Sequence, residues 1–160
     1  MRDVVANTSP LLYLHQLGLL ELLPRLYERV VVPSAVVAEL SDGARLGYDV
    51  PTLSTLPWAL VEAPPGAAIL PMVTALGDGE RAAIALAASR KSDLLLLDDG
   101  LARRHARLLG LTVTGTLGVL LRGKTGGHVP AVAPVVDKLE QLGFRLAPET
   151  RAAVLRLAGE

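Results

Sequence analysis

Five short, largely apolar segments separated by stretches of helical periodicity constrain the fold of this chain more than any other feature. The segments are residues 3–6, 29–32, 60–62, 94–97 and 111–113. Short strands that are apolar throughout belong to parallel sheets that helices cover on both faces, with right-handed connections between the strands. The pattern therefore predicts an α/β protein with three layers, α/β/α, around a five-stranded parallel sheet.

The segments between the predicted strands indicate helices. We expect a helix from Pro10 to Gly18, a shorter one before Pro24, helices over 35–40 and 81–90, one from Leu101 to Gly110, and others from about Thr116, Val132 and Pro148. Residues 41–57 lack periodicity, which predicts a long connection. With 160 residues and no interdomain linker, we expect a single domain over 1–160 whose last helices, from about 131, pack on the core.

Composition and charge exclude several classes of protein. The chain has no cysteine, so disulfides and thiolate zinc sites are excluded. Its apolar runs fall far short of the roughly 20 residues that cross a bilayer, and Asp3 interrupts the first apolar segment of an N-terminus without a signal peptide. We therefore expect a cytoplasmic protein with no membrane contact. Because 16 basic residues balance 16 acidic ones, any nucleic-acid site must be local.

Polar residues at the ends of predicted strands and the starts of helices are the candidates for chemistry. Asn7 follows the first strand and Asp98 and Asp99 follow the fourth, whereas Glu39, Asp78 and Glu80 lie on or before helices. Sites in parallel sheets form beyond the carboxyl ends of the strands. If these carboxylates converge, each close pair repels by about 4 kcal/mol at an effective dielectric constant near 20, so the cluster requires a cation.

Clustered oxygen ligands select Mg²⁺ or Mn²⁺, which keep several bound waters. One such water can attack a phosphodiester while the metal neutralises charge on the phosphate, so metal-assisted hydrolysis is the predicted reaction. Arg103, Arg104 and Arg81 are the candidates to hold the flanking phosphates.

Each residue also has a structural interpretation. Asp78 can cap the helix that follows it, and Glu80 can favour the positive end of that helix. Asp99 can cap the helix from Leu101, which makes Asp98 the stronger catalytic candidate of the two. Glu39 and the three arginines can equally belong to solvated helix faces. Only their joint placement favours a functional site.

The chain resembles a PIN domain in its motifs and their order. The matching residues are 7–12, Val32-Pro33, Glu39-Leu40, Gly79-Glu80 with 84–87, and residues 97–99 with Ala102-Arg103. These motifs resemble those of the VapC-like toxin ribonucleases and of a less characterised branch of predicted PIN-domain nucleic-acid-binding proteins. The resemblance implies a PIN-like fold and a Mg²⁺- or Mn²⁺-dependent endoribonuclease that acts on RNA. It further implies a homodimer and, for a toxin, a small antitoxin protein as partner.

The resemblance also assigns the family's acidic positions. They fall on Asn7, Glu39, Glu80 and Asp98, with Ser9 near the first and with Asp78 and Asp99 as local alternatives. We expect the side chains of the four main residues to meet in one cleft at the carboxyl ends of the central strands.

Asn7 departs from the family pattern, which usually has aspartate at this position. Its amide oxygen can face a metal but supplies no negative charge. An alternative hypothesis is therefore a catalytically weakened PIN-fold module that binds RNA or protein. A phosphotransfer enzyme of similar architecture is disfavoured, because it needs a nucleophilic aspartate where Asn7 stands.

Overall fold

The sheet has five parallel strands, as the sequence predicts. A computed structural model describes residues 2–65 and 75–160. The strands are β1 (Asp3–Ala6), β2 (Arg29–Pro33), β3 (Ala59–Glu62), β4 (Leu94–Leu96) and β5 (Val113–Thr114), in the spatial order β3-β2-β1-β4-β5. The chain builds the sheet from β1 outward through β2 and β3, then crosses back to add β4 on the other side of β1. The carboxyl ends of β1 and β4 thus form the topological switch point of the sheet.

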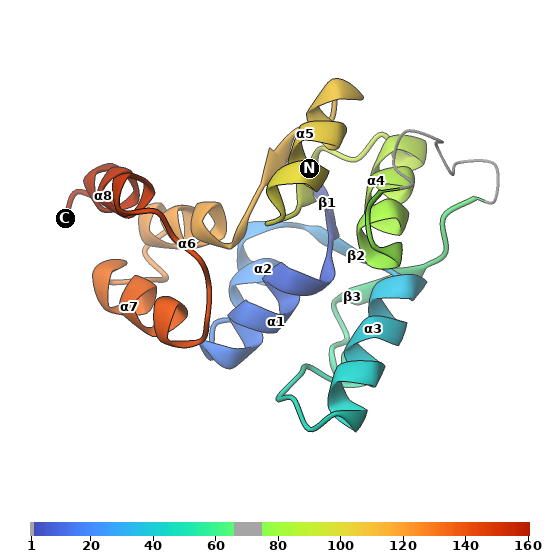
Figure 1. Cartoon of the computed structure of the whole chain (residues 1–160), viewed down its shortest axis with the longest axis horizontal. Coiled ribbons are helices and arrows are strands. Elements are labelled where there is room, and N and C mark those ends of the chain that lie inside the picture. The colour runs from blue at the N-terminus through green and yellow to red at the C-terminus, as the bar shows by residue number, and fades with distance from the viewer. Residues whose placement is uncertain (1, 66–74) are drawn as a thin grey trace.

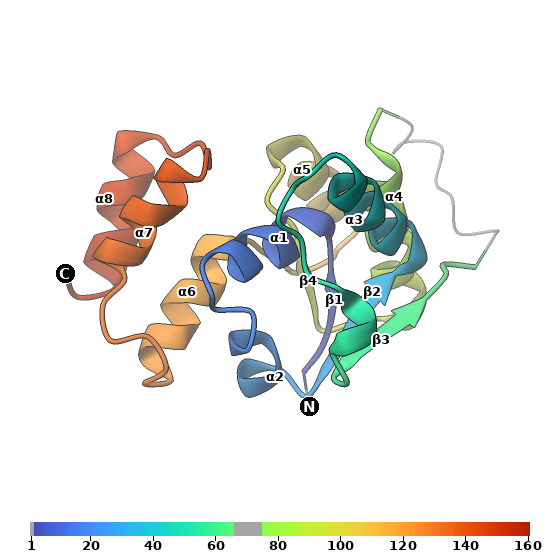
Figure 2. The ribbon, with the colours of Figure 1, turned by 90° about the horizontal axis from the view of Figure 1, so that it is seen from below.

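Helices cover both faces of the sheet, so the predicted three-layer α/β fold is confirmed (Figure 1). They are α1 (Thr8–Gln16), α2 (Leu22–Leu26), α3 (Ser34–Arg45), α4 (Asp78–Arg90), α5 (Gly100–Leu108), α6 (Thr116–Thr125), α7 (Ala133–Gln141) and α8 (Pro148–Leu157), with a 3-10 turn at Leu53–Thr55. Figure 2 shows α7 and α8 side by side beyond α6, on the side of α6 away from the sheet. Within residues 2–65 and 75–160, no helix combines the length and the apolar character needed to span a bilayer.

The core divides into two clusters because neighbouring strand residues point to opposite faces. Val4, Val30 and Leu94 contribute to the cluster beneath α1, α2 and α6, which also contains Val136 and Leu139 of α7. On the other face, alternate residues of the same three strands pack against α4 and α5; they are Val5, Val31 and Leu95. This alternation explains why the strand sequences are apolar throughout.

The start of α1 and the end of α2 differ from the sequence prediction. Helix α1 begins at Thr8 instead of Pro10, because Asn7 already has the extended conformation of an N-cap residue. Helix α2 does not end before Pro24 but continues through it to Leu26. Pro24 lies in the first turn, where its missing N–H would have no partner inside the helix.

Two further boundaries were also misplaced by the sequence prediction. Helix α3 extends beyond the predicted end at residue 40 to Arg45, and Gly47, with φ of 89°, follows its C-terminus. The long connection predicted over 41–57 is correspondingly shorter. Strand β5 is Val113–Thr114 and not 111–113, so its end lies directly before Gly115. The residues of α3 after position 40 are mostly exposed and lack apolar periodicity, so no signal in the sequence indicates that the helix continues.

Strand β4 positions the residues that follow it, and its stability can be tested with a matched pair of substitutions. Leu96 is fully buried, whereas Leu108 on α5 is 74% exposed. We expect Leu96→Ala to lower the free energy of unfolding by about 2–5 kcal/mol, because it removes packed methyl groups and leaves a cavity. Leu108→Ala should change it by less than about 0.5 kcal/mol. Urea denaturation of both variants checks this, and equal effects would contradict the described core.

Candidate functional site

A pocket of about 560 Å³ lies at the carboxyl ends of β1 and β4, at the switch point of the sheet. Four regions of the chain line it: Asn7, Ser9 and Tyr13 after β1; Glu80 at the start of α4; Asp98, Asp99 and Gly100 after β4; and Gly143, Phe144 and Arg145 between α7 and α8. Four of the residues predicted from the sequence as metal ligands therefore share one pocket. They are Asn7, Glu80, Asp98 and Asp99.

Asn7 contributes an unpaired polar atom to this pocket. Its backbone N–H donates to the carbonyl oxygen of Leu96 at 3.0 Å, which fixes residue 7 beside the end of β4. The residue is only 4% exposed, and its side-chain Oδ1 is buried without a hydrogen-bond partner. Leaving a buried acceptor unsatisfied costs about 1–3 kcal/mol. The amide oxygen is therefore a site that a donor or a cation would stabilise.

Asp98 is held rigidly by Thr116, the first residue of α6. Its Oδ1 accepts from the Thr116 backbone N–H and its Oδ2 from the Thr116 hydroxyl, both at 2.7 Å. Burial raises the pKa of Asp98, while the bonds from Thr116, the charge of Arg103 and a hydrogen bond from Ser9 act to lower it. A Cβ at position 115 would lie 2.6 Å from Asp98 Oδ1, so a side chain there would displace the Asp98 carboxylate.

Glu80 and Asp99 sit at the N-termini of α4 and α5. Glu80 Oε2 accepts from the Gly77 N–H at 3.1 Å, and Asp99 Oδ2 accepts from the Ala102 N–H at 2.9 Å. Asp99 thus caps α5 while it also lines the pocket. Burial raises the pKa of Glu80, the Gly77 bond lowers it, and the negative charges of Asp99 and Glu39 raise it further. Asp99 and Glu39 are thus close enough to affect the ionisation of Glu80.

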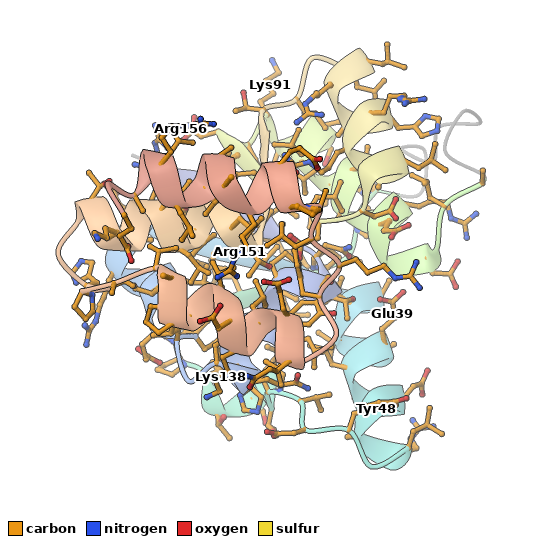
Figure 3. The ribbon with its side chains drawn as sticks, turned by 60° about the vertical axis from the view of Figure 1, so that its left-hand side comes forward. Glu39, Tyr48, Lys91, Lys138, Arg151 and Arg156 are labelled. Atoms are coloured by element: carbon orange, nitrogen blue, oxygen red, sulfur yellow. The ribbon has the colours of Figure 1, made fainter. Side chains whose placement is uncertain are left out.

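Glu39 lies next to the pocket but does not line it. Figure 3 shows it where α3 approaches α4, and its Oε1 accepts from the Gly79 N–H at 2.9 Å. Its other oxygen accepts from the hydroxyl of Thr8. A Cβ at position 79 would lie 2.5–2.7 Å from the Glu39 carboxylate, so glycine is required for this contact. Glu39 thereby joins α3 to the first residues of α1 and α4.

The remaining predicted residues do not reach the acidic pocket. Asp78 and Arg81 pair with each other and line a separate depression beside Pro64. Arg104 is exposed on α5. Arg103 is half-buried, donates to the carbonyl oxygen of Leu97 at 3.1 Å, and lines an adjoining pocket. Burial lowers the pKa of Arg103, as does Arg107, while the negative charge of Asp98 raises it.

Sequence reasoning missed several residues of the site. Thr116 could have been noticed, because it begins a helix directly after the last strand. Tyr13 sits one helical turn after Ser9 and was hidden among the apolar residues of α1. Phe144 and Arg145 come from a loop between two helices, and no pattern in the sequence links that loop to the strand ends.

The raised pKa of Glu80 predicts a pH dependence of stability in the absence of divalent metal. A carboxyl whose pKa is higher in the folded state stabilises the fold fully below its unfolded pKa, and this contribution is lost as pH rises through the folded pKa. Glu80→Gln should therefore be more stable than the parent at neutral pH, by less than about 1 kcal/mol because the side chain is partly solvated and screened.

The stability advantage of Glu80→Gln should shrink as pH falls through the folded pKa of Glu80. Thermal melts in EDTA between neutral and acidic pH measure it, with Glu28→Gln as the exposed control that shows no advantage. A pH-independent difference between Glu80→Gln and the parent would show that the Glu80 carboxyl titrates normally.

Comparisons with known proteins agree with the fold. The family model described as PIN domain matches residues 3–160. A solved PilT N-terminus domain protein from the hyperthermophilic archaeon Sulfolobus solfataricus P2 is similar with a TM-score of 0.55 and 23% identity, over 74% of this chain and 90% of that one, which shows a shared fold. The comparison with curated proteins gives no match. Because the family model spans nearly the whole chain, this chain belongs to the PIN domain family.

Proposed function

We propose that this chain is a Mg²⁺- or Mn²⁺-dependent endoribonuclease built on a single PIN-like domain. The carrying observation is the buried, unpaired Oδ1 of Asn7 in one pocket with Glu80, Asp98 and Asp99. An amide oxygen and several carboxylates at the switch point of a parallel sheet are the donors that a hard divalent cation prefers. PIN-domain membership supports a nuclease, the usual activity of the family.

The donor set fits a cation that is bound largely through water. In the part of the chain that the structure describes, no three acidic or histidine side chains stand ready as a complete ligand set. Mg²⁺ commonly uses only one or two carboxylates and keeps several waters. Asp98, Glu80 and the amide oxygen of Asn7 would supply such a site. When bound, the cation would neutralise charge on a phosphate and make a bound water more acidic.

Each of the residues in and beside the pocket has its own proposed role. Asp98, fixed by Thr116 and Ser9, holds its charge in one position. Glu80 would add a second carboxylate to the cation site, and because burial raises its pKa, a bound cation would favour its charged form. Asn7 supplies a buried amide oxygen without adding charge. Glu39 keeps α4, and with it Glu80, in place through the Gly79 N–H.

A pair of identical chemical changes tests the catalytic role of the pocket. Asp98→Asn removes a charge from the pocket, whereas Asp78→Asn removes one from an exposed side chain paired with Arg81. We expect Asp98→Asn to reduce Mn²⁺-dependent cleavage of RNA by at least about 100-fold and Asp78→Asn to change it by less than about twofold. Cleavage of a fluorescent RNA measures both rates, and thermal melts verify folding. Full activity of a folded Asp98→Asn variant would refute the assignment.

A second function, a PIN-fold module that binds RNA or protein with little catalysis, is favoured by two features of the same pocket. Asn7 supplies no negative charge, and both oxygens of Asp98 already accept hydrogen bonds from Thr116. Both features weaken the electrostatic attraction of the pocket for a cation.

The substitution Asn7→Asp separates the two functions. It should lower the melting temperature in EDTA, because it adds a carboxylate beside Glu80 and Asp98, and it should enlarge the stabilisation by Mn²⁺ through tighter binding. Melts with and without Mn²⁺ measure this, alongside RNA cleavage. Cleavage by the parent establishes the nuclease; cleavage that begins only with Asn7→Asp establishes the binding module. If Mn²⁺ raises the melting temperature of Asn7→Asp and of the parent by the same amount, residue 7 does not bind the cation.

The proposed partners follow from the family resemblance. RNA is the proposed substrate, and a homodimer is the proposed assembly. We further propose that the chain is the toxin of a toxin-antitoxin pair, held inactive by a small antitoxin protein.

A further inference from the structure

The acidic pocket continues into a second pocket on the other side of Asp98. The second one has a volume of about 380 Å³ and is lined by Arg103, Gly115 and Thr150 among others. Asp98, Phe144 and Arg145 line both pockets. The two hollows therefore form one path that passes the carboxylates, with Arg103 along one half and Arg145 at the point where the halves meet.

Arg145 is a cation whose side chain is available. It is exposed, and among the described residues it forms no hydrogen bond or ion pair. Two arginines of α4 and α8 differ: Arg81 pairs with Asp78, and Arg151 pairs with Asp137 and Glu140. An unpaired guanidinium beside a group of carboxylates adds positive charge where a polyanion would have to approach.

The backbone that carries Arg145 is held in place from both sides. The Phe144 ring meets the Tyr13 ring of α1 edge-on, with centroids 5.2 Å apart and an interplanar angle of 79°. The Phe144 N–H donates to the carbonyl oxygen of Leu139 in α7. Figure 3 shows Arg151 between α7 and α8, where it joins the two helices through Asp137 at 2.6 Å. The backbone of the loop is thus preorganised, so binding has to order only the Arg145 side chain.

We propose that Arg145 is a substrate-binding residue that grips a backbone phosphate of a single RNA strand lying along this path, next to the bond held at Asp98. The role of Arg145 rests on the proposed nuclease function, in which it is the residue that binds the RNA backbone. Arg103, Arg104 and Arg81 were the arginines singled out by sequence, but only Arg103 shares the path. Guanidinium groups bind phosphates in a forked geometry, and the half-buried rings of Phe144 and Tyr13 offer stacking surface for an unpaired base.

The test compares Arg145→Gln with Arg156→Gln, which removes the same charge from an exposed position on α8 outside both pockets. The probe is a 2′-O-methyl single-stranded oligonucleotide of about 12 nucleotides, long enough to fill a single-strand site. Binding is measured in EDTA, so that no metal-dependent cleavage occurs. We expect Arg145→Gln to weaken binding by about five- to tenfold and to reduce the slope of log affinity against log salt by about 0.7. Arg145→Lys should recover part of the loss, and Arg156→Gln should stay within about twofold of the parent.

Equal effects of Arg145→Gln and Arg156→Gln, or a parent that does not bind the oligonucleotide, would overturn the proposal. The melting temperature of Arg145→Gln should match that of the parent, because the side chain is exposed and unpaired. The binding comparison is independent of catalysis, so a parent that fails to cleave RNA refutes the nuclease without deciding the role of Arg145. If the parent does cleave, Arg145→Gln should raise KM more than it lowers kcat, as expected for a contact kept in both ground and transition states.

Discussion

The pairing of β1 with β4 is the interaction on which the rest of the structure depends. Val5 lies opposite Leu95 in the parallel register, and the Asn7 N–H extends the ladder to the Leu96 carbonyl oxygen. This pairing brings residue 7 beside residue 98 and places the reversal of strand order between them. Helices α1 and α5 start directly after these strands, so their first turns surround the pocket.

The carboxylates near the pocket repel one another, and close contacts with the backbone hold two of them in place. The negative charges of Asp99 and Glu39 add to burial in raising the pKa of Glu80. Glycines at 79 and 115 allow the carboxylates of Glu39 and Asp98 to approach the backbone within distances that no side chain would permit. A neutral residue at position 7 lessens the repulsion, which stabilises the protein without metal but weakens its attraction for a cation. In the proposed nuclease, the same residue would therefore affect stability and activity in opposite directions.

The C-terminal helices pack into the core, and the loop between α7 and α8 reaches the pocket. Helix α7 packs into the core through Val136 and Leu139, and the loop after it returns to the strand ends, where Phe144 meets Tyr13. The acidic residues come from β-α junctions, as the family pattern implies, but the basic side of the path depends on this returning loop. Arg145 and the carboxylates of the pocket thus come from different parts of the chain.

The sequence alone determined the fold class, because uniformly apolar strands alternating with helices require a parallel sheet with two covered faces. It also placed Asn7, Glu80, Asp98 and Asp99 at element boundaries, which is local information carried by caps and strand ends. Tertiary structure decided the rest. It engaged Glu39 with Gly79 and brought Arg145 to the pocket. These outcomes depend on contacts between residues far apart in the chain, whose geometry is set by packing, and periodicity within a segment contains no information about them.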